Sequence, residues 1–235
     1  MLEDLDRGAD LASGAIYLTD DQVAGRGQGA NRWHSTAGAN LTFSMLLRPD
    51  HLAADRLFAL TQVASLAVCG TVEKLLAGKG VAVRIKWPND IYVNDRKVAG
   101  ILIQNGLRGH HVQWSVVGIG LNVNEAAFPP ELHGSAVSLR QVLHRSLDLG
   151  TVLNDLVAVL QQWYERLEAR DYMGLQAAYL VSLYRLNQTI NFRLADGGGD
   201  FRATVTGVDE RGRLRLRHAD GELRAYDLRS LRWLL

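Results

Sequence analysis

The sequence contains one cysteine, Cys69, in 235 residues. A single thiol excludes an internal disulfide, and it also excludes a zinc site built from several thiolates. Cys69 lies within "LFALTQVASLAVCGTVEKLL", whose apolar spacing is typical of a helix. We therefore expect a buried, unreactive thiol rather than a nucleophile, in a protein of a reducing, cytoplasmic compartment.

The chain also lacks a strong net charge and a long hydrophobic run. Its formal net charge is +1, so no global field attracts it to nucleic acid or to a membrane. No stretch reaches the roughly 20 apolar residues that a spanning helix needs. The opening "MLEDLDRGAD" has neither the basic region nor the apolar run of a signal peptide. We expect neither a nucleic-acid partner nor a membrane partner.

The order of apolar patterns predicts an α+β fold followed by a small β domain. Strand patterns cover 15–19 and 41–47, and four further β-rich runs lie between 81 and 123. Amphipathic helix patterns cover 53–76 and 151–169, and a shorter one begins at 172. From about residue 188 the chain shows short strands and glycine turns alone. We predict a mixed β-sheet with flanking helices over 1–187 and a small β-barrel over 188–235.

The stretch "KWPNDIYVNDRKVAG", residues 86–100, predicts a charged corner at the end of a strand. Asn89 and Asp90 supply a turn with a carboxylate after the strand that carries Lys86. A short hairpin then returns Lys97 to the same corner. Gly100 interrupts an apolar strand, which indicates that something approaches the backbone closely. Two lysines, a carboxylate and a bare backbone suit a ligand that carries a phosphate or a carboxylate.

The stretch "GRGQGANRW", residues 25–33, has the glycine content of a mobile surface loop. It lacks the Gly-Lys-Ser/Thr ending of a Walker A loop, and a strand follows it where a dinucleotide fingerprint would open a helix. A tryptophan is costly to leave on a mobile loop, so the presence of Trp33 favours a segment that closes over a ligand. In "VVGIGLNVN", residues 116–124, Gly118 narrows a buried strand and Asn122 can pair with a base edge. Taken alone, this motif is explained first by glycines in a turn or in packing.

In this order and spacing, "GRGQGANRW", "KWPNDIYVNDRKVAGILIQ" and "VVGIGLNVN" resemble the motifs of biotin protein ligases over roughly residues 15–235. The form without an appended DNA-binding module fits, because no residues are available for a helix-turn-helix. The resemblance implies a class II synthetase-like catalytic domain and an SH3-like C-terminal barrel. It also implies that ATP, as its Mg²⁺ complex, activates biotin as biotinyl-5′-AMP. The biotinyl group then passes to a lysine of a biotin carboxyl carrier protein.

The resemblance also implies roles for individual residues. The catalytic set is Lys97, which would reach the carboxylate and the α-phosphate, with Arg26, Lys86 and Asp90. The biotin-binding set is Gln22, Gly25, Arg26, Gly27, Lys97, Gly100 and Gly118. The nucleotide-binding set is Gln28, Asn31, Trp33, Asn89, Lys97 and Asn122. No metal ligand of the protein's own is implied.

Two departures from the family pattern have consequences. Gln28 and Asn31 stand where many members carry arginine, so fewer cations would hold the phosphate of the intermediate. The Ser-Thr-Asn segment that normally precedes the first matched strand is missing here. We therefore expect weaker biotin binding and an exposed sheet edge.

Two other functions stay open at this point. A lipoate or octanoyl ligase uses the same lysine-targeting chemistry, but "KWPND" and the C-terminal barrel favour biotin. A catalytically impaired binder of biotin or biotinyl-AMP would fit the missing segment, whereas Lys97 beside Asp90 favours an enzyme. The resemblance also implies that two copies can pair across the sheet edge as a homodimer.

Overall fold

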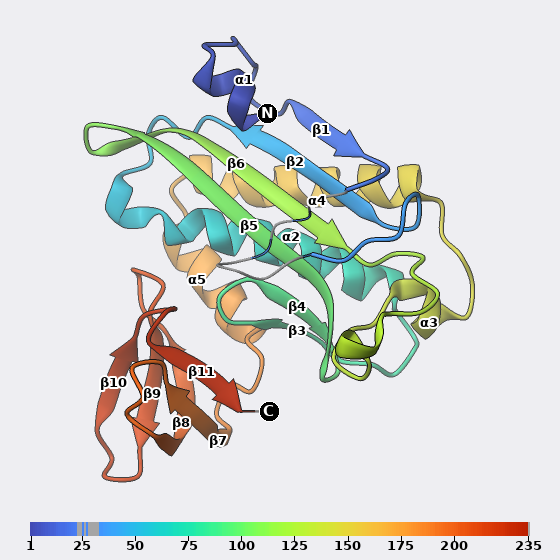
Figure 1. Ribbon diagram of the computed structural model, residues 1–235. Coiled ribbons are helices and arrows are strands. Elements are labelled where there is room, and N and C mark those ends of the chain that lie inside the picture. The colour runs from blue at the N-terminus through green and yellow to red at the C-terminus, as the bar shows by residue number, and fades with distance from the viewer. Residues whose placement is uncertain (23–24, 26, 28–32, 235) are drawn as a thin grey trace.

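The first part of the fold is built on a six-stranded antiparallel sheet, formed by β1 to β6 (Figure 1). The computed structural model describes residues 1–22, 25, 27 and 33–234. The strands are β1 (Ile16–Thr19), β2 (Leu41–Leu47), β3 (Val83–Lys86), β4 (Asp90–Val93), β5 (Arg96–Arg108) and β6 (His111–Leu121). They lie in the order β1-β2-β6-β5-β4-β3, so the two long strands, β5 and β6, stand in the middle.

One face of this sheet is covered by helices (Figure 1). These are α2 (Phe58–Leu75), α4 (Leu149–Glu168) and α5 (Tyr172–Val181). Helix α2 contacts the sheet on one side and α4 and α5 on the other, which explains why it is buried along most of its length. Helix α4 is amphipathic, with Leu156 and Leu160 buried and the opposite side exposed. Sheet, α2 and α4 therefore form three successive layers.

The sequence patterns located most of these elements. Strand β2 has the predicted bounds, whereas the helix expected from residue 53 begins with a separate 3-10 turn, Ala54–Arg56, ahead of α2. The short helix α3 (Leu139–Leu143) was not predicted, because five residues are too few to show a period. A second short helix, α1 (Leu2–Asp6), precedes β1. Cys69 lies buried in α2 as expected, and burial raises the pKa of its thiol to about 12.

A second, five-stranded sheet follows α5. Its strands are β7 (Thr189–Leu194), β8 (Asp200–Val208), β9 (Leu214–His218), β10 (Leu223–Tyr226) and β11 (Leu231–Leu234), in the order β10-β9-β8-β7-β11. Phe192, Val205, Leu214 and Leu216 are fully buried within it. The α+β class is confirmed, while the domain boundary between 187 and 188 stays a prediction. Of the helices described, none has the length and apolar character that crossing a bilayer requires.

A hairpin of the second sheet, between β8 and β9, contacts the charged corner of the first sheet. The indole N–H of Trp87, at the end of β3, donates to the carbonyl oxygen of Gly212 at 2.8 Å. Gly212 also packs directly on the ring of Phe58 in α2. The hydroxyl of Tyr179 in α5 donates to the carbonyl oxygen of Pro88 at 2.8 Å. The "KWPND" turn is therefore fixed by contacts with both the helical layer and the second sheet.

Replacing Gly212 with alanine should weaken this contact. A Cβ at Gly212 would collide with the Phe58 ring, whereas a Cβ at Gly221 would meet nothing within 4 Å. Both hairpin glycines have a φ of +85°, so the backbone strain of the two alanine variants is matched. Urea unfolding should show Gly212→Ala to be less stable than Gly221→Ala by about 1–3 kcal/mol. Equal stabilities would show that the ring contact contributes nothing.

Candidate active site

A hollow of about 420 Å³ lies on the face of the first sheet that α2 does not cover. Its floor comes from alternate positions of β2, β6 and β5, which the register places side by side. One row joins Thr42, Gly120 and Gly100, and the next joins Ser44, Gly118 and Leu102. Because glycine has no side chain, the floor is open to a ligand that lies close to the backbone.

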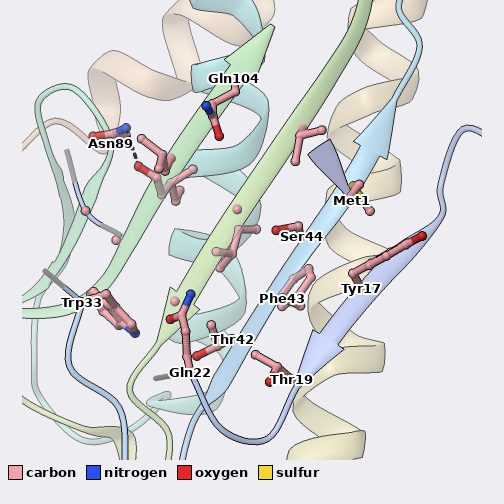
Figure 2. Close-up of a pocket in the computed structure, with 18 of the residues that line it drawn as sticks. Met1, Tyr17, Thr19, Gln22, Trp33, Thr42, Phe43, Ser44, Asn89 and Gln104 are labelled. Atoms are coloured by element: carbon pink, nitrogen blue, oxygen red, sulfur yellow. Dashed lines mark hydrogen bonds between the residues drawn. The ribbon is translucent and has the colours of Figure 1, made fainter. Parts of the chain in front are cut away.

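The indole of Trp33 rests on this glycine floor. A Cβ at Gly120 would collide with the indole, and a Cβ at Gly100 would lie 3.2 Å from Cζ3 of Trp33. The backbone N–H of Trp33 donates to the carbonyl oxygen of Gly25 at 3.1 Å. In Figure 2, Trp33 and Gln22 point into the hollow that Thr42 of β2 also lines.

Three buried polar atoms of the lining have no hydrogen-bond partner among the described residues. They are Oε1 of Gln22, Nε1 of Trp33 and Oγ1 of Thr42. A buried polar group without a partner costs about 1–3 kcal/mol, so native structures rarely leave several together. The hollow therefore offers an acceptor, a donor and a hydroxyl to a polar ligand.

A charge pair stands at the rim of the hollow. Nζ of Lys97 lies 2.6 Å from Oδ1 of Asp90, and both side chains are about 30% exposed. The same ammonium lies 5.7 Å from the ring centroid of Trp33, close enough for a cation–π contact. The hairpin of β4 and β5 thus brings Lys97 to Asp90, as the sequence predicted. Such a partly exposed pair adds little to stability, but its cation faces a space where an anion can lie.

Lys97 is also fixed through its backbone. Its N–H donates to the carbonyl oxygen of Ser135 at 2.8 Å, and its own carbonyl accepts from the N–H of Val137 at 2.9 Å. The segment 135–137 therefore runs beside this residue of β5. The amide of Asn89 donates to the carbonyl oxygen of Ile101 at 2.8 Å, which ties the "KWPND" turn to the same strand (Figure 2).

Lys86 lies opposite Asp90 in the pairing of β3 and β4 but does not line the hollow. Its Nζ lies 3.1 Å from the hydroxyl of Tyr92 and 5.9 Å from the ring centroid of Trp233 in β11. Burial lowers the pKa of Lys86, partly offset by the nearby carboxylate of Asp90. Lys86 therefore stands between the two sheets, behind the charge pair.

The structure brings many of the predicted residues together and leaves others apart. Gln22, Gly27, Trp33, Asn89, Asp90, Lys97, Gly100 and Gly118 line the hollow. Gly25, Lys86 and Asn122 lie outside the lining, and the amide of Asn122 donates to the carbonyl oxygen of Val137 at 3.2 Å. Arg26, Gln28 and Asn31 lie outside the described residues.

Sequence reasoning missed several lining residues. They are Tyr17, Thr19, Thr42, Ser44 and Gln104. A signal existed for Thr42 and Ser44, because they alternate with buried apolar residues in "LTFSMLL" and so share the side of β2 that faces away from α2. In the part of the chain that the structure describes, no three or more His, Cys, Asp or Glu side chains cluster as a metal site.

Two family models match this chain. The model of the biotin/lipoate A/B protein ligase family matches residues 1–122, and the model of the biotin protein ligase C terminal domain matches residues 186–227. The chain belongs to the biotin/lipoate A/B protein ligase family. The second match places it among the biotin protein ligases and confirms the resemblance of its motifs.

Individual relatives agree with this membership. Biotin--[acetyl-CoA-carboxylase] ligase of Paracoccus denitrificans is 32% identical over 222 residues, which are 90% of this chain and 87% of that protein. The bifunctional ligase/repressor BirA of Bacillus spizizenii is 34% identical over 218 residues, which are 91% of this chain but 64% of the relative. The chain therefore spans less than two thirds of that relative's length.

A solved structure shares the fold. The biotin protein ligase from Aquifex aeolicus, in complex with biotin and ATP, has a TM-score of 0.80 at 24% identity, over 98% of this chain and 94% of that one. In this biotin protein ligase fold the first family match covers β1 to β6. The second match covers β7 to β10, and α4 and α5 lie between the two matched segments.

The packing of Trp33 on Gly120 can be tested by fluorescence. Gly120→Ala should push the indole off the floor and shift its emission, because a Cβ there collides with the ring. Gly118→Ala is the matched control, since its Cβ would meet the carbonyl oxygen of Leu102 at an ordinary 3.4 Å. The chain has five tryptophans, so each spectrum is compared with its Trp33→Phe counterpart. Unchanged Trp33 emission in Gly120→Ala would contradict the packing.

Proposed function

We propose that this protein is an ATP-dependent ligase that activates biotin as biotinyl-5′-AMP. It then transfers the biotinyl group to one lysine of a biotin carboxyl carrier protein. The observation that carries the proposal is the pair of Lys97 and Asp90 at the rim of a hollow whose floor is glycine. Family membership supports the reaction class, and the match to the biotin protein ligase C terminal domain favours biotin over lipoate.

In the first step, a carboxylate oxygen of biotin attacks the α-phosphorus of ATP. A new P–O bond forms, the bond to the β-phosphate oxygen breaks, and pyrophosphate leaves with the electron pair. Negative charge gathers on the reacting carboxylate and α-phosphate, which Lys97 stabilises from the rim. Mg²⁺ arrives as part of the ATP complex and neutralises phosphate charge.

In the second step, the ε-amine of the carrier lysine attacks the carbonyl carbon of the mixed anhydride. The amide bond forms, the bond to the phosphate oxygen breaks, and AMP leaves. The amine must lose a proton, and we assign its acceptance to Asp90, whose carboxylate lines the hollow 2.6 Å from Nζ of Lys97. No covalent bond to the protein forms, so the residues act through position and charge.

The remaining roles follow from where the residues lie. The unpartnered atoms of Gln22 and Thr42 suit the polar ureido ring of biotin, while Gly100 and Gly118 let it approach the sheet. Trp33 offers a ring face to the purine. Gly25, Lys86 and Asn122 lie outside the lining, and we assign them to its support.

Some parts of the proposal rest on the family resemblance alone. These are the phosphate and nucleotide contacts of Arg26, Gln28 and Asn31. The edge strand β1 exposes Tyr17 and Leu18, and pairing of two copies there stays a prediction. The proposal involves no nucleic acid and no membrane.

Removing Lys97 tests the assignment. Lys97→Ala should reduce biotin-dependent exchange of pyrophosphate into ATP by about 10²-fold or more, because the developing charge loses its cation. The fold should survive, since the side chain is 31% exposed. Lys74→Ala is the matched control, because Lys74 forms an ion pair with Asp155 on the far helices. Normal turnover of Lys97→Ala would overturn the site.

The full reaction needs ATP, Mg²⁺, labelled biotin and a carrier domain. Label in an amide on the carrier lysine supports the ligase. Exchange without transfer would instead favour an impaired enzyme that binds and activates biotin. Transfer of labelled lipoate in preference to biotin would favour the other branch of the family.

A further inference from the structure

Glu125 is a buried carboxylate that the proposed reaction does not use. It lies four residues beyond the end of β6, at 3% exposure, and it is not part of the hollow's lining. A buried carboxylate is costly unless hydrogen bonds replace its water shell. The hydrogen-bond partners of Glu125 therefore indicate its role.

Both carboxylate oxygens of Glu125 accept hydrogen bonds from the segment that follows Trp33. Oε1 accepts from the hydroxyl of Thr36 at 2.7 Å. Oε2 accepts from the backbone N–H of Thr36 at 3.1 Å and from the side-chain amide of Asn40 at 2.7 Å. The segment 33–40 is thus held at two points, 89 and 85 residues away in sequence.

These bonds favour the ionised carboxylate. Burial by itself would raise the pKa of Glu125, but the hydrogen bonds from Thr36 and Asn40 outweigh it and hold the pKa below its ordinary value. Nε2 of His34 lies 3.9 Å from Oε2, so protonation of this histidine would favour the charged form further. Glu125 therefore presents two acceptor oxygens and no donor to its neighbours.

The backbone around Glu125 reaches the other side of the site. The N–H of Val123 donates to Oδ1 of Asn40 at 2.9 Å, and the carbonyl oxygen of Glu125 accepts from the hydroxyl of Ser138 at 2.7 Å. Ser138 directly follows the segment 135–137, which bonds to the backbone of Lys97 on both sides. One residue therefore joins the segment that carries Trp33 to the segment that fixes Lys97.

We propose that Glu125 is a positioning residue that sets the indole of Trp33 and the ammonium of Lys97 in their relative places. This inference rests on the proposed ligase function, because only that function requires the purine face and the charge pair to act on one molecule. Glu125 touches no substrate. It acts through Thr36 on one side and through Ser138 on the other.

Glu125→Gln is the sharpest probe, because it keeps the shape but replaces one oxygen by an NH₂ group. An NH₂ group in the place of Oε1 can donate to the hydroxyl of Thr36, which can also accept, so the variant can keep the number of hydrogen bonds. It removes the negative charge that strengthens all three bonds to Thr36 and Asn40. Thr36→Val removes the hydroxyl from the other end, at an exposed residue whose loss does not threaten folding. The two variants therefore change the same hydrogen bond, one at the Glu125 side chain and the other at the Thr36 hydroxyl.

The expected result is a rise in KM for ATP of about fivefold or more in Glu125→Gln, with a smaller fall in kcat, because weaker hydrogen bonds hold the segment that carries Trp33 less firmly in place; fivefold corresponds to about 1 kcal/mol. A residue that served stability alone would lower the active fraction, and so kcat, without moving KM. The effect of the double variant Glu125→Gln/Thr36→Val should be smaller than the sum of the two single effects, because both changes act on one shared contact.

Asp148→Asn is the matched control. At the start of α4, Oδ1 of Asp148 accepts from both the backbone N–H and the hydroxyl of Thr151 at 2.8 Å, so the same two threonine groups bind a carboxylate there, away from the site. This variant should leave KM for ATP unchanged. An unchanged KM in folded Glu125→Gln, or fully additive effects with Thr36→Val, would overturn the inference.

A second readout separates this inference from the proposed function. Should the wild-type protein show no biotin-dependent exchange, the proposed function fails, but the emission of Trp33 still reports its position. That emission should shift in Glu125→Gln and in Thr36→Val and stay unchanged in Asp148→Asn. If Glu125→Gln does not fold, Thr36→Val decides, and unshifted Trp33 emission there would contradict the positioning role.

Discussion

The site depends on the absence of side chains at Gly100, Gly118 and Gly120, on the uncovered face of the first sheet. Strand alternation places these glycines on one side while Ile101 and Ile119 turn to the other side and pack in the core. One face of these two strands therefore packs in the core, and the other face lacks side chains at the three glycines. A methyl group at Gly120 would occupy the place of Trp33, so the hollow exists because the backbone itself forms its floor.

The proposed role of the charged groups depends on their position beside this glycine floor. Lys97 and Asp90 come from a hairpin at the rim, so their pair stands where a ligand lying on the glycines would end. Lys86 lies behind them, enclosed by Tyr92 and Trp233, and joins the corner to the second sheet. Trp87 makes a further link through Gly212. The second sheet therefore supports the corner that holds the charge pair.

Local patterns predicted the local parts of this site. The bounds of β2 follow from alternation, and the meeting of Lys97 with Asp90 follows from a short turn at Asn94 and Asp95. The sequence pattern also located Lys86 on the strand that leads into this corner. It could not show what covers the Lys86 side chain, because Trp233 comes from the far end of the chain.

Contacts between distant segments were beyond such patterns. Trp33 was predicted to meet a ligand, but its seat on Gly120 depends on how β6 pairs with β2 and β5. Glu125 gave no signal, since its partner Thr36 is 89 residues away and neither residue belongs to a motif. Helix α3 was missed because its five residues and capping box show no apolar period. Tertiary pairing decided the position of Trp33 and the hydrogen bonds of Glu125, whereas α3 begins at a local capping box of Ser138 and Gln141.

The most direct test of the central claim is a crystal structure with a non-hydrolysable analogue of biotinyl-5′-AMP. The account predicts that the analogue lies on Gly100 and Gly118, with its acyl-phosphate linkage within hydrogen-bond distance of Nζ of Lys97 and its purine against Trp33. An analogue bound elsewhere, or a Lys97 ammonium turned away from that linkage, would contradict the account.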